Sequence, residues 1–354
     1  MPHEGLARLA IVLFNLGAPD HPEAVRPFLR NLFNDPAILR VPPFVRAVLG
    51  RWIARSRDKP AEENYARLGG RSPLLDLTRA QATALTAALP EFRVQCFIAM
   101  RYWHPMSDAA ARAVFAWRPD RVLLLPLYPQ YSSTTSGSAL TAWREAAARA
   151  GLAATVHAIC CYPTEAGYIS AVTTMAKTLH EAKRSELSSS VPLRILFSAH
   201  GLPKSIVQRG DPYEWQIERT VAAILCAWGN PEPDWVICYQ SRATPQEWLS
   251  PSTEAEIERA ARDRVAVLVV PVAFVSEHSE TLVELDLDYR ALAERLGVPG
   301  YFRAPAPATH PSFITGLADM VRAELARPPG LHAMTGSRLC PSQHQLCALP
   351  CPPC

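Results

Sequence analysis

A single histidine follows a short apolar run in the middle of the chain, at a point where an imidazole is well placed for chemistry. Residues 193–199 are mostly apolar, His200 comes next, and Gly201 and Pro203 end the run. Such a run predicts a buried parallel strand that stops abruptly. Ligands bind beyond the carboxyl ends of strands in open α/β sheets. We therefore expect His200 to be a reactive or metal-binding residue.

Carboxylates follow a second apolar run, residues 265–274. A helix that begins there with Ser276 as its N-cap would place four acidic side chains three or four residues apart on one face: Glu277, Glu280, Glu284 and Asp288. An acidic helix face is usually only a solvated face, and the helix dipole favours carboxylates near the N-terminus without any function. Beside an imidazole on a neighbouring strand end, however, the carboxylates predict a site for a divalent metal ion.

Longer motifs around these residues resemble those of the ferrochelatase family. They are Phe14-Asn-Leu-Gly-Ala-Pro19, Leu68-Gly-Gly-Arg-Ser-Pro73, Leu127-Tyr-Pro-Gln-Tyr131, Ser198-Ala-His-Gly-Leu-Pro203, Arg209-Gly-Asp-Pro-Tyr213, Tyr239-Gln-Ser-Arg242 and Phe274-Val-Ser-Glu-His-Ser-Glu280. The motifs keep their order along residues 9–325, which is nearly the whole chain. The resemblance implies a lyase that inserts ferrous iron into protoporphyrin IX to form protohaem, the last step of haem biosynthesis.

The resemblance also implies roles for single residues. His200 and Glu280 would bind the iron and perform the catalysis. The porphyrin would contact Arg57, Tyr65, Ser72 and Tyr239. Imidazole and carboxylate suit Fe(II), and a neutral imidazole that accepts a pyrrole proton contributes roughly 10²–10⁴-fold to the rate. Three further carboxylates offer either a route for the cation or a drain for protons: Glu277, Glu284 and Asp288.

The composition is that of an ordinary globular protein long enough for two domains. The 354 residues are 49% hydrophobic and 19% charged, and the net charge of +3 is too small to indicate nucleic-acid binding. The apolar run at residues 9–16 is shorter than a membrane span and is better interpreted as a core strand than as a signal sequence. We expect a cytoplasmic protein.

Apolar runs and helical patterns alternate along the chain, which predicts parallel sheets with right-handed crossovers. The expected strands lie near 9–16, 94–100, 121–127, 154–160, 193–199, 235–239, 265–274 and 300–303. With the resemblance, this α/β pattern implies the chelatase fold: two similar Rossmann-like domains, with parallel four-stranded sheets, that face a common cleft. The expected divisions are 1–164, 165–310, a helix at 311–330 that returns to the first domain, and a Cys-rich tail at 331–354.

The last fifteen residues contain four cysteines: Cys340, Cys347, Cys351 and Cys354. This density predicts an iron–sulfur or zinc site. Many ferrochelatases carry a C-terminal [2Fe–2S] cluster, and the resemblance implies one here, although the spacing of these cysteines departs from the family pattern. Either all four tail thiols bind the cluster, or another residue such as Cys161 supplies one ligand.

Residues 31–52 combine apolar side chains with arginines. Such a segment is able to touch a membrane surface, and the resemblance places it at the lip of the porphyrin cleft, although core packing is the commoner role of such a pattern. Two alternative functions remain open. One is a chelatase for another tetrapyrrole or metal, and the other is a haem- or metal-binding sensor on a chelatase scaffold. A sensor would have lost His200 or Glu280, and both are present.

Overall fold

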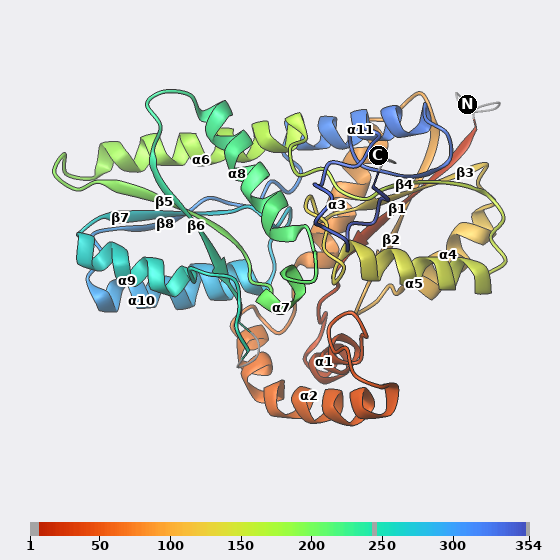
Figure 1. Ribbon diagram of the computed structural model, residues 1–354, viewed down its shortest axis with the longest axis horizontal. Helices are drawn as coiled ribbons and strands as arrows, with labels where there is room; N and C mark the ends of the chain where they lie inside the picture. The colour runs from red at the N-terminus through yellow and green to blue at the C-terminus, as the bar shows by residue number, and fades with distance from the viewer. Residues whose placement is uncertain (1–6, 243–245, 352–354) are drawn as a thin grey trace. The chain divides into compact units, whose positions relative to one another are not determined.

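The computed structural model describes residues 7–242 and 246–351 and divides into two compact units. Unit 1 takes the chain up to Tyr162, Leu317–Leu339 and the segment from Ala348 onward, and unit 2 takes Pro163–Gly316 and Cys340–Cys347. Each unit is built around one parallel sheet (Figure 1).

The sheet of unit 1 has the strand order β2-β1-β3-β4-β9, and all of its pairings are parallel. These strands are β1 (Arg8–Asn15), β2 (Arg93–Met100), β3 (Arg121–Pro126), β4 (Thr155–Ile159) and β9 (Gly330–His332). Helices α4 (Ser107–Trp117) and α5 (Ser136–Arg149) pack on it through a core that includes Val12, Phe14, Val114 and Trp143. Burial on both faces explains why the central strands are continuous apolar runs.

Unit 1 also contains the helices that precede β2. They are the short η1 (Pro22–Ala24), α1 (Val25–Phe33), α2 (Pro43–Ala66) and α3 (Leu74–Ala87). Helices α1 and α2 pack together around Phe28, Phe33 and Ala54, and this core continues to Tyr102 and Trp103 after β2. The segment from residue 31 to 52 therefore contributes to a packed core on one side and leaves its other side exposed.

The sheet of unit 2 has the order β6-β5-β7-β8, again all parallel. Its strands are β5 (Leu193–His200), β6 (Asp234–Gln240), β7 (Ala266–Pro271) and β8 (Tyr301–Arg303). Its helices are α6 (Ala166–Glu186), α7 (Lys204–Val207), α8 (Tyr213–Trp228), α9 (Thr253–Asp263), η2 (Glu280–Asp288) and α10 (Tyr289–Leu296). Helices α6 and α8 cover one face of the sheet, and α9 and α10 cover the other (Figure 1).

The eight predicted strands all form, but the sheet of unit 1 has a fifth strand that the sequence analysis missed. Strand β9 has only three residues, Gly-Leu-His, and pairs with β4 from His157 to Ile159. Three residues without an apolar run give no recognisable strand pattern. The late helix α11 (Pro311–Leu325) forms within the predicted segment 311–330 and ends at Leu325. Pro328 and Pro329 cannot continue a helix, which explains this end.

Candidate functional site

His200 is the last residue of β5, in the interior of the unit 2 sheet between β6 and β7. All seven preceding strand residues are buried, and His200 itself is partly exposed. The Tyr213 hydroxyl donates a hydrogen bond to the His200 carbonyl oxygen at 3.0 Å. His200 Nδ1 lies 2.6 Å from the Gly201 carbonyl oxygen. Nδ1 therefore carries a proton, and Nε2 is the nitrogen that is turned toward the acidic segment.

The acidic segment begins its helix later than predicted, and the helix is not an α-helix. Residues 276–278 are not helical, and η2 is a π-helix that starts at Glu280. The expectation of an α-helix capped by Ser276 is therefore wrong. Instead, the Thr281 hydroxyl accepts the His278 backbone N–H at 3.0 Å, and the first helical bonds go to the His278 carbonyl. The non-helical connection brings His278 as well as Glu280 toward the end of β5.

One carboxylate oxygen lies between two imidazoles. Glu280 Oε2 is 3.5 Å from His200 Nε2 and 3.6 Å from His278 Nε2. His278 is buried, and the exposed fraction of the Glu280 side chain is 28%. Two nitrogens and a carboxylate oxygen that converge in this way supply the donor types that ferrous iron accepts.

The two imidazoles differ in their pKa. Burial lowers the pKa of His200, but the charge of Glu280, its hydrogen bond and the Gly201 carbonyl outweigh that effect and raise the pKa to about 9. Burial lowers the pKa of His278, and the charge of Glu280 offsets this only in part. Burial raises the pKa of Glu280, but the effects of the two histidines, above all the positive charge of His200, together outweigh it. The net pKa of Glu280 is about 2. At neutral pH the site therefore holds a proton on His200 and a neutral His278.

Glu284 is held in place by four hydrogen bonds. It accepts from the Ser241 N–H at 2.8 Å, from the Tyr289 hydroxyl at 2.8 Å and from Gln240 Nε2 at 3.2 Å, and also from the Ser241 hydroxyl. Ser241 adopts a φ of 65°, which is uncommon for a residue with a side chain. Burial and the nearby charge of Glu280 raise the pKa of Glu284. Glu284 is thus a fixed carboxylate that accepts a proton more readily than an ordinary one.

The four predicted carboxylates do not form one file. Glu277 precedes the helix and accepts a hydrogen bond from Arg303 Nη1 at 2.6 Å and from the Ala306 N–H at 2.9 Å. Burial raises its pKa, but Arg303 and these hydrogen bonds produce a net lowering. Asp288 is exposed at the end of η2. Only Glu280 and Glu284, one turn apart, meet at the histidine site.

The residues expected to contact the porphyrin fall in both units. Arg57 is exposed on α2, Tyr65 is buried near the end of that helix, and Ser72 is buried beside the start of α3, all in unit 1. Tyr239 lies on β6 in unit 2 and is buried, and the charges of Glu214 and Glu218 on α8 add to the burial that raises its pKa. Gln240, the next residue, instead binds the carbonyl of Glu280 at 2.9 Å.

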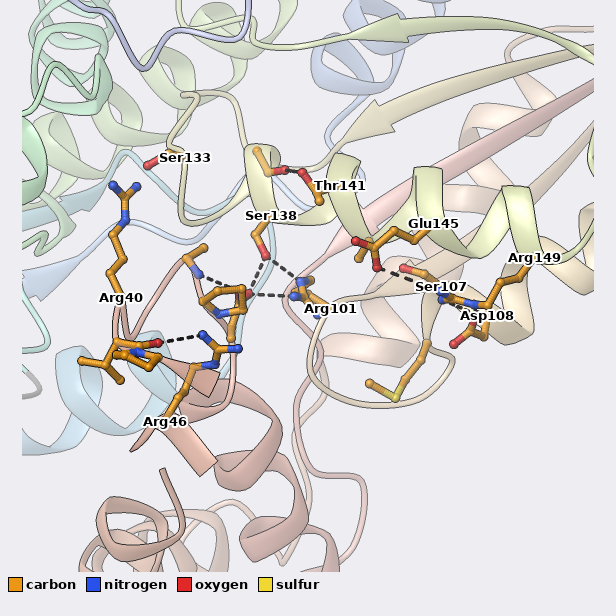
Figure 2. Close-up of a pocket in the computed structure, with 18 residues that line it drawn as sticks. Arg40, Arg46, Arg101, Ser107, Asp108, Ser133, Ser138, Thr141, Glu145 and Arg149 are labelled. Atoms are coloured by element: carbon orange, nitrogen blue, oxygen red, sulfur yellow. Dashed lines mark hydrogen bonds and ion pairs between the residues drawn. The ribbon is translucent and has the colours of Figure 1, made fainter. Parts of the chain in front are cut away.

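Unit 1 contains a hollow of about 780 Å³ beside the start of α2 (Figure 2). Four arginines line it: Arg40, Arg46, Arg101 and Arg149. Carboxylates already neutralise two of them, since Asp35 pairs with Arg101 and Asp108 pairs with Arg149, both at 2.8 Å. No ion pair of the described residues involves Arg40 or Arg46. The unneutralised positive charge of the hollow is therefore that of Arg40 and Arg46.

The tail cysteines differ in exposure in the described part of the chain. Cys340 is buried and accepts a hydrogen bond from Gln216 Nε2 at 3.1 Å, Cys347 is partly exposed, and Cys351 is exposed. Cys354 lies outside the described residues. Across residues 7–242 and 246–351, no group of three His, Cys, Asp or Glu side chains has an arrangement ready to hold a metal ion. Among the described residues, Cys340, Cys347 and Cys351 do not form such a group.

The sequence analysis missed the residues that support the site. His278 lies inside one of the motifs, but the sequence assigned it no role. Gln240 and Ser241 gave no signal because their contacts with Glu284 join segments more than 40 residues apart. Tyr289 lies only five residues after Glu284, and no motif marked it. Tyr213 ends another of the motifs, and the sequence likewise assigned it no role. Tyr213 does not lie at the end of an apolar run, so the sequence gave no reason to pair it with His200. Only the fold brings the two residues together.

A parallel α/β unit with a histidine and a carboxylate at a strand end defines a chelatase-type site, and solved structures agree on the fold. SirB from Bacillus subtilis with Fe³⁺ superposes with a TM-score of 0.53 at 11% identity, covering 90% of this chain and 96% of that chain. The sirohydrochlorin chelatase SirB in complex with cobalt, from Bacillus subtilis subspecies spizizenii, gives a TM-score of 0.50 at 13% identity and covers 90% and 95%. At this identity the likeness shows the chelatase fold alone.

Sequence relatives identify the family. The ferrochelatase family model matches residues 8–325. A ferrochelatase of Caulobacter vibrioides is 50% identical over 327 residues, which cover 91% of this chain and 92% of that protein. A ferrochelatase of Phenylobacterium zucineum is 49% identical over 346 residues, covering 96% and 98%. The chain belongs to the ferrochelatase family and is an enzyme that inserts ferrous iron into protoporphyrin to form protohaem.

Proposed function

We propose that His200 and Glu280 receive the ferrous ion and that His278, beside them, helps to manage the protons that the ion displaces. The observation that carries this proposal is the position of Glu280 Oε2 within 3.6 Å of both imidazoles. Iron can bind His200 Nε2 only when the proton there has left. Neutral His278 and the carboxylate of Glu284, whose pKa is raised, are then the nearest groups suited to accept pyrrole protons.

We propose further that protons or cations pass between solvent and the site along η2. Exposed Asp288 and half-buried Glu284 share this helix with Glu280, and four hydrogen bonds fix the Glu284 carboxylate. Glu277 lies outside the helix and is bound to Arg303, so it positions the connection to η2. For the porphyrin, we propose contacts to Arg57, Tyr65, Ser72 and Tyr239, as the family resemblance implies.

Binding of ferrous iron to the porphyrin-free enzyme should release a proton from His200. Since Glu280 raises the pKa of His200 to about 9, we expect affinity to rise about tenfold per pH unit from neutral pH to about 9 and to level off above it. Anaerobic calorimetry in buffers of different ionisation enthalpy measures both quantities. In Glu280→Gln the charge that raises the pKa is gone, and the plateau should begin at lower pH. A binding constant that does not change between neutral pH and pH 9 would contradict the assignment.

We propose that the enzyme works in the cytoplasm and touches a bilayer with α2. Phe44, Val48 and Trp52 recur every four residues, so they lie on one helix face, and they are 75%, 68% and 67% exposed. Exposed Arg51 and Arg55 accompany them. Apolar side chains flanked by arginines suit the surface of a membrane with anionic lipids. No helix of the described residues is long and apolar enough to span a membrane.

Vesicle sedimentation tests this surface. We expect the protein to bind vesicles that contain anionic phosphatidylglycerol, and we expect the double change Phe44→Ser and Trp52→Ser to reduce binding at least about tenfold, because two large apolar side chains no longer enter the interface. Trp235→Ser, which alters an exposed tryptophan on β6 in unit 2, is the matched control. Equal binding by the double variant and the control would contradict this surface.

For the tail, we propose that [2Fe–2S] binding by Cys340, Cys347, Cys351 and Cys354 requires the tail to rearrange. In the structure, residues 340–347 instead dock on the start of α8. The Leu346 N–H donates to the Gly210 carbonyl at 3.0 Å, and the rings of Trp215 and His344 are 5.9 Å apart. Iron and acid-labile sulfide analysis of anaerobically purified protein tests for the cluster, and Cys351→Ser should lower both if it forms.

Gly210→Ala is expected to release the docked tail. Gly210 has a φ of 96°, and a Cβ there would lie 2.6 Å from the backbone nitrogen of Gln345. The left-handed conformation alone costs about 1–2 kcal/mol with a side chain, and the close contact adds to it. Hydrogen exchange should then speed up in residues 340–347 and stay unchanged in β5. Gly229→Ala, which has a positive φ of 79° and no neighbour within 4 Å, is the matched control.

A further inference from the structure

Two adjacent cysteines, Cys160 and Cys161, follow β4 directly at its carboxyl end. Both are buried, with 1% of each residue exposed. Their Sγ atoms lie 3.3 Å apart, so the two thiols are in contact. Neither residue has a role in the iron and proton steps proposed above. The pair is therefore a dithiol whose chemistry the enzyme's activity does not explain.

The backbone of the pair is held by the segment that contains β9. The Cys160 N–H donates to the His332 carbonyl at 2.8 Å, and the Cys161 carbonyl accepts from the Met334 N–H at 3.1 Å. These bonds lie on either side of the peptide that joins the two cysteines. They restrain that peptide while the two Sγ atoms remain in contact at 3.3 Å.

This geometry favours chelation over a disulfide. A disulfide requires sulfur atoms about 2.05 Å apart and Cα atoms usually about 4.4–6.8 Å apart, whereas neighbouring Cα atoms across a trans peptide are about 3.8 Å apart. Closing the bond would distort a peptide that is held on both sides. An ion bound about 2.3 Å from each sulfur tolerates sulfurs up to about 4.6 Å apart. The observed 3.3 Å fits such an ion without movement of the backbone.

The surroundings limit the ion to one that two thiolates satisfy. Zinc needs about four ligands, and the described residues contain no group of three His, Cys, Asp or Glu side chains placed to hold a metal. We propose that Cys160 and Cys161 form a binding site for a soft, thiophilic centre that takes two thiolates. An organic trivalent arsenical represents this class of ligand. Each thiol forms a sulfur–arsenic bond, and its proton leaves with a hydroxide of the arsenical as water, so nothing is oxidised or reduced.

We expect entry to the buried pair through local opening of the sheet edge beside β4. Strand β9 is an edge strand of three residues, and such short edge elements open more easily than the central strands. We therefore expect binding to be slow but to persist once formed, since releasing a chelated ion requires both sulfur bonds to break.

The test uses the full-length protein and phenylarsine oxide as the probe. After an excess of a monothiol has removed singly bound arsenical, native mass spectrometry counts the equivalents that remain. Wild type should retain one equivalent more than Cys160→Ala and one more than Cys161→Ala. Cys226→Ala, which removes an exposed cysteine on α8, should match wild type. Retention of the wild-type number of equivalents by either single variant would overturn the proposal, because the site needs both sulfurs.

Peptide mapping of the wild-type adduct keeps the test decisive if a variant does not fold. Alanine replaces each buried thiol with a small apolar group, and circular dichroism checks the fold of each variant. The retained arsenic should be on the peptide that contains residues 160 and 161. Arsenic found only on the C-terminal peptide with the tail cysteines would overturn the assignment.

Discussion

His200→Ala is expected to slow iron insertion by at least about 10²–10⁴-fold, the usual contribution of a positioned proton-transfer group. The variant loses the imidazole that lies 3.5 Å from Glu280, and thus both a ligand for iron and the group whose proton the iron displaces. Protoporphyrin binding should persist, because the residues proposed to contact the macrocycle stay in place. Anaerobic mixing with protoporphyrin IX and ferrous iron, followed by loss of the free-base fluorescence, measures the rate.

The matched control is His180→Ala on α6. The ring of His180 packs against Trp228 at 5.3 Å and makes no contact that the proposed mechanism uses. Its rate should stay close to that of wild type. Full activity in His200→Ala would contradict the assigned site. Loss of porphyrin binding in the same variant would show instead that His200 acts through the macrocycle pocket.

Local patterns predicted the strands well because burial on both faces makes each one an apolar run. The end of β5 is such a case: the run, the polar His200 and the Gly201 turn all occur within nine residues. The π-helix at Glu280 could not be predicted in the same way. Its carboxylates recur at helical spacing whether the helix starts at Ser276 or at Glu280, and the difference decides whether His278 joins the site.

The supporting contacts were beyond prediction for a different reason. Glu284 is held by Gln240 and Ser241, which precede it by more than 40 residues, and no periodicity links such segments. The same holds for the fifth strand of unit 1, which follows β4 by about 170 residues and is too short to leave a pattern. Motif resemblance identified the reacting residues, and only the fold shows what positions them.

Asp35 is the clearest example of a residue without a sequence signal and with a large expected effect. Its side chain is 1% exposed and pairs with Arg101 at 2.8 Å. It also accepts hydrogen bonds from the Tyr102 hydroxyl and the Ala37 N–H, each at 2.8 Å, and from the Ser138 hydroxyl. Figure 2 shows Arg101 and Ser138 pointing toward this point in the wall of the hollow. One carboxylate thus joins the turn after α1, the end of β2 and the start of α5.

Asp35→Ala should therefore destabilise the protein by about 3–5 kcal/mol, because removing one partner leaves the Arg101 charge without compensation. Asp108→Ala breaks an ion pair in the same hollow, but its side chains are 53% and 59% exposed, and it should cost only about 0–1 kcal/mol. Urea unfolding followed by circular dichroism compares the two midpoints. Equal shifts would mean that burial does not set the strength of the Asp35 network. A large shift for Asp35→Ala alone would assign it the role of anchoring the lip of the hollow.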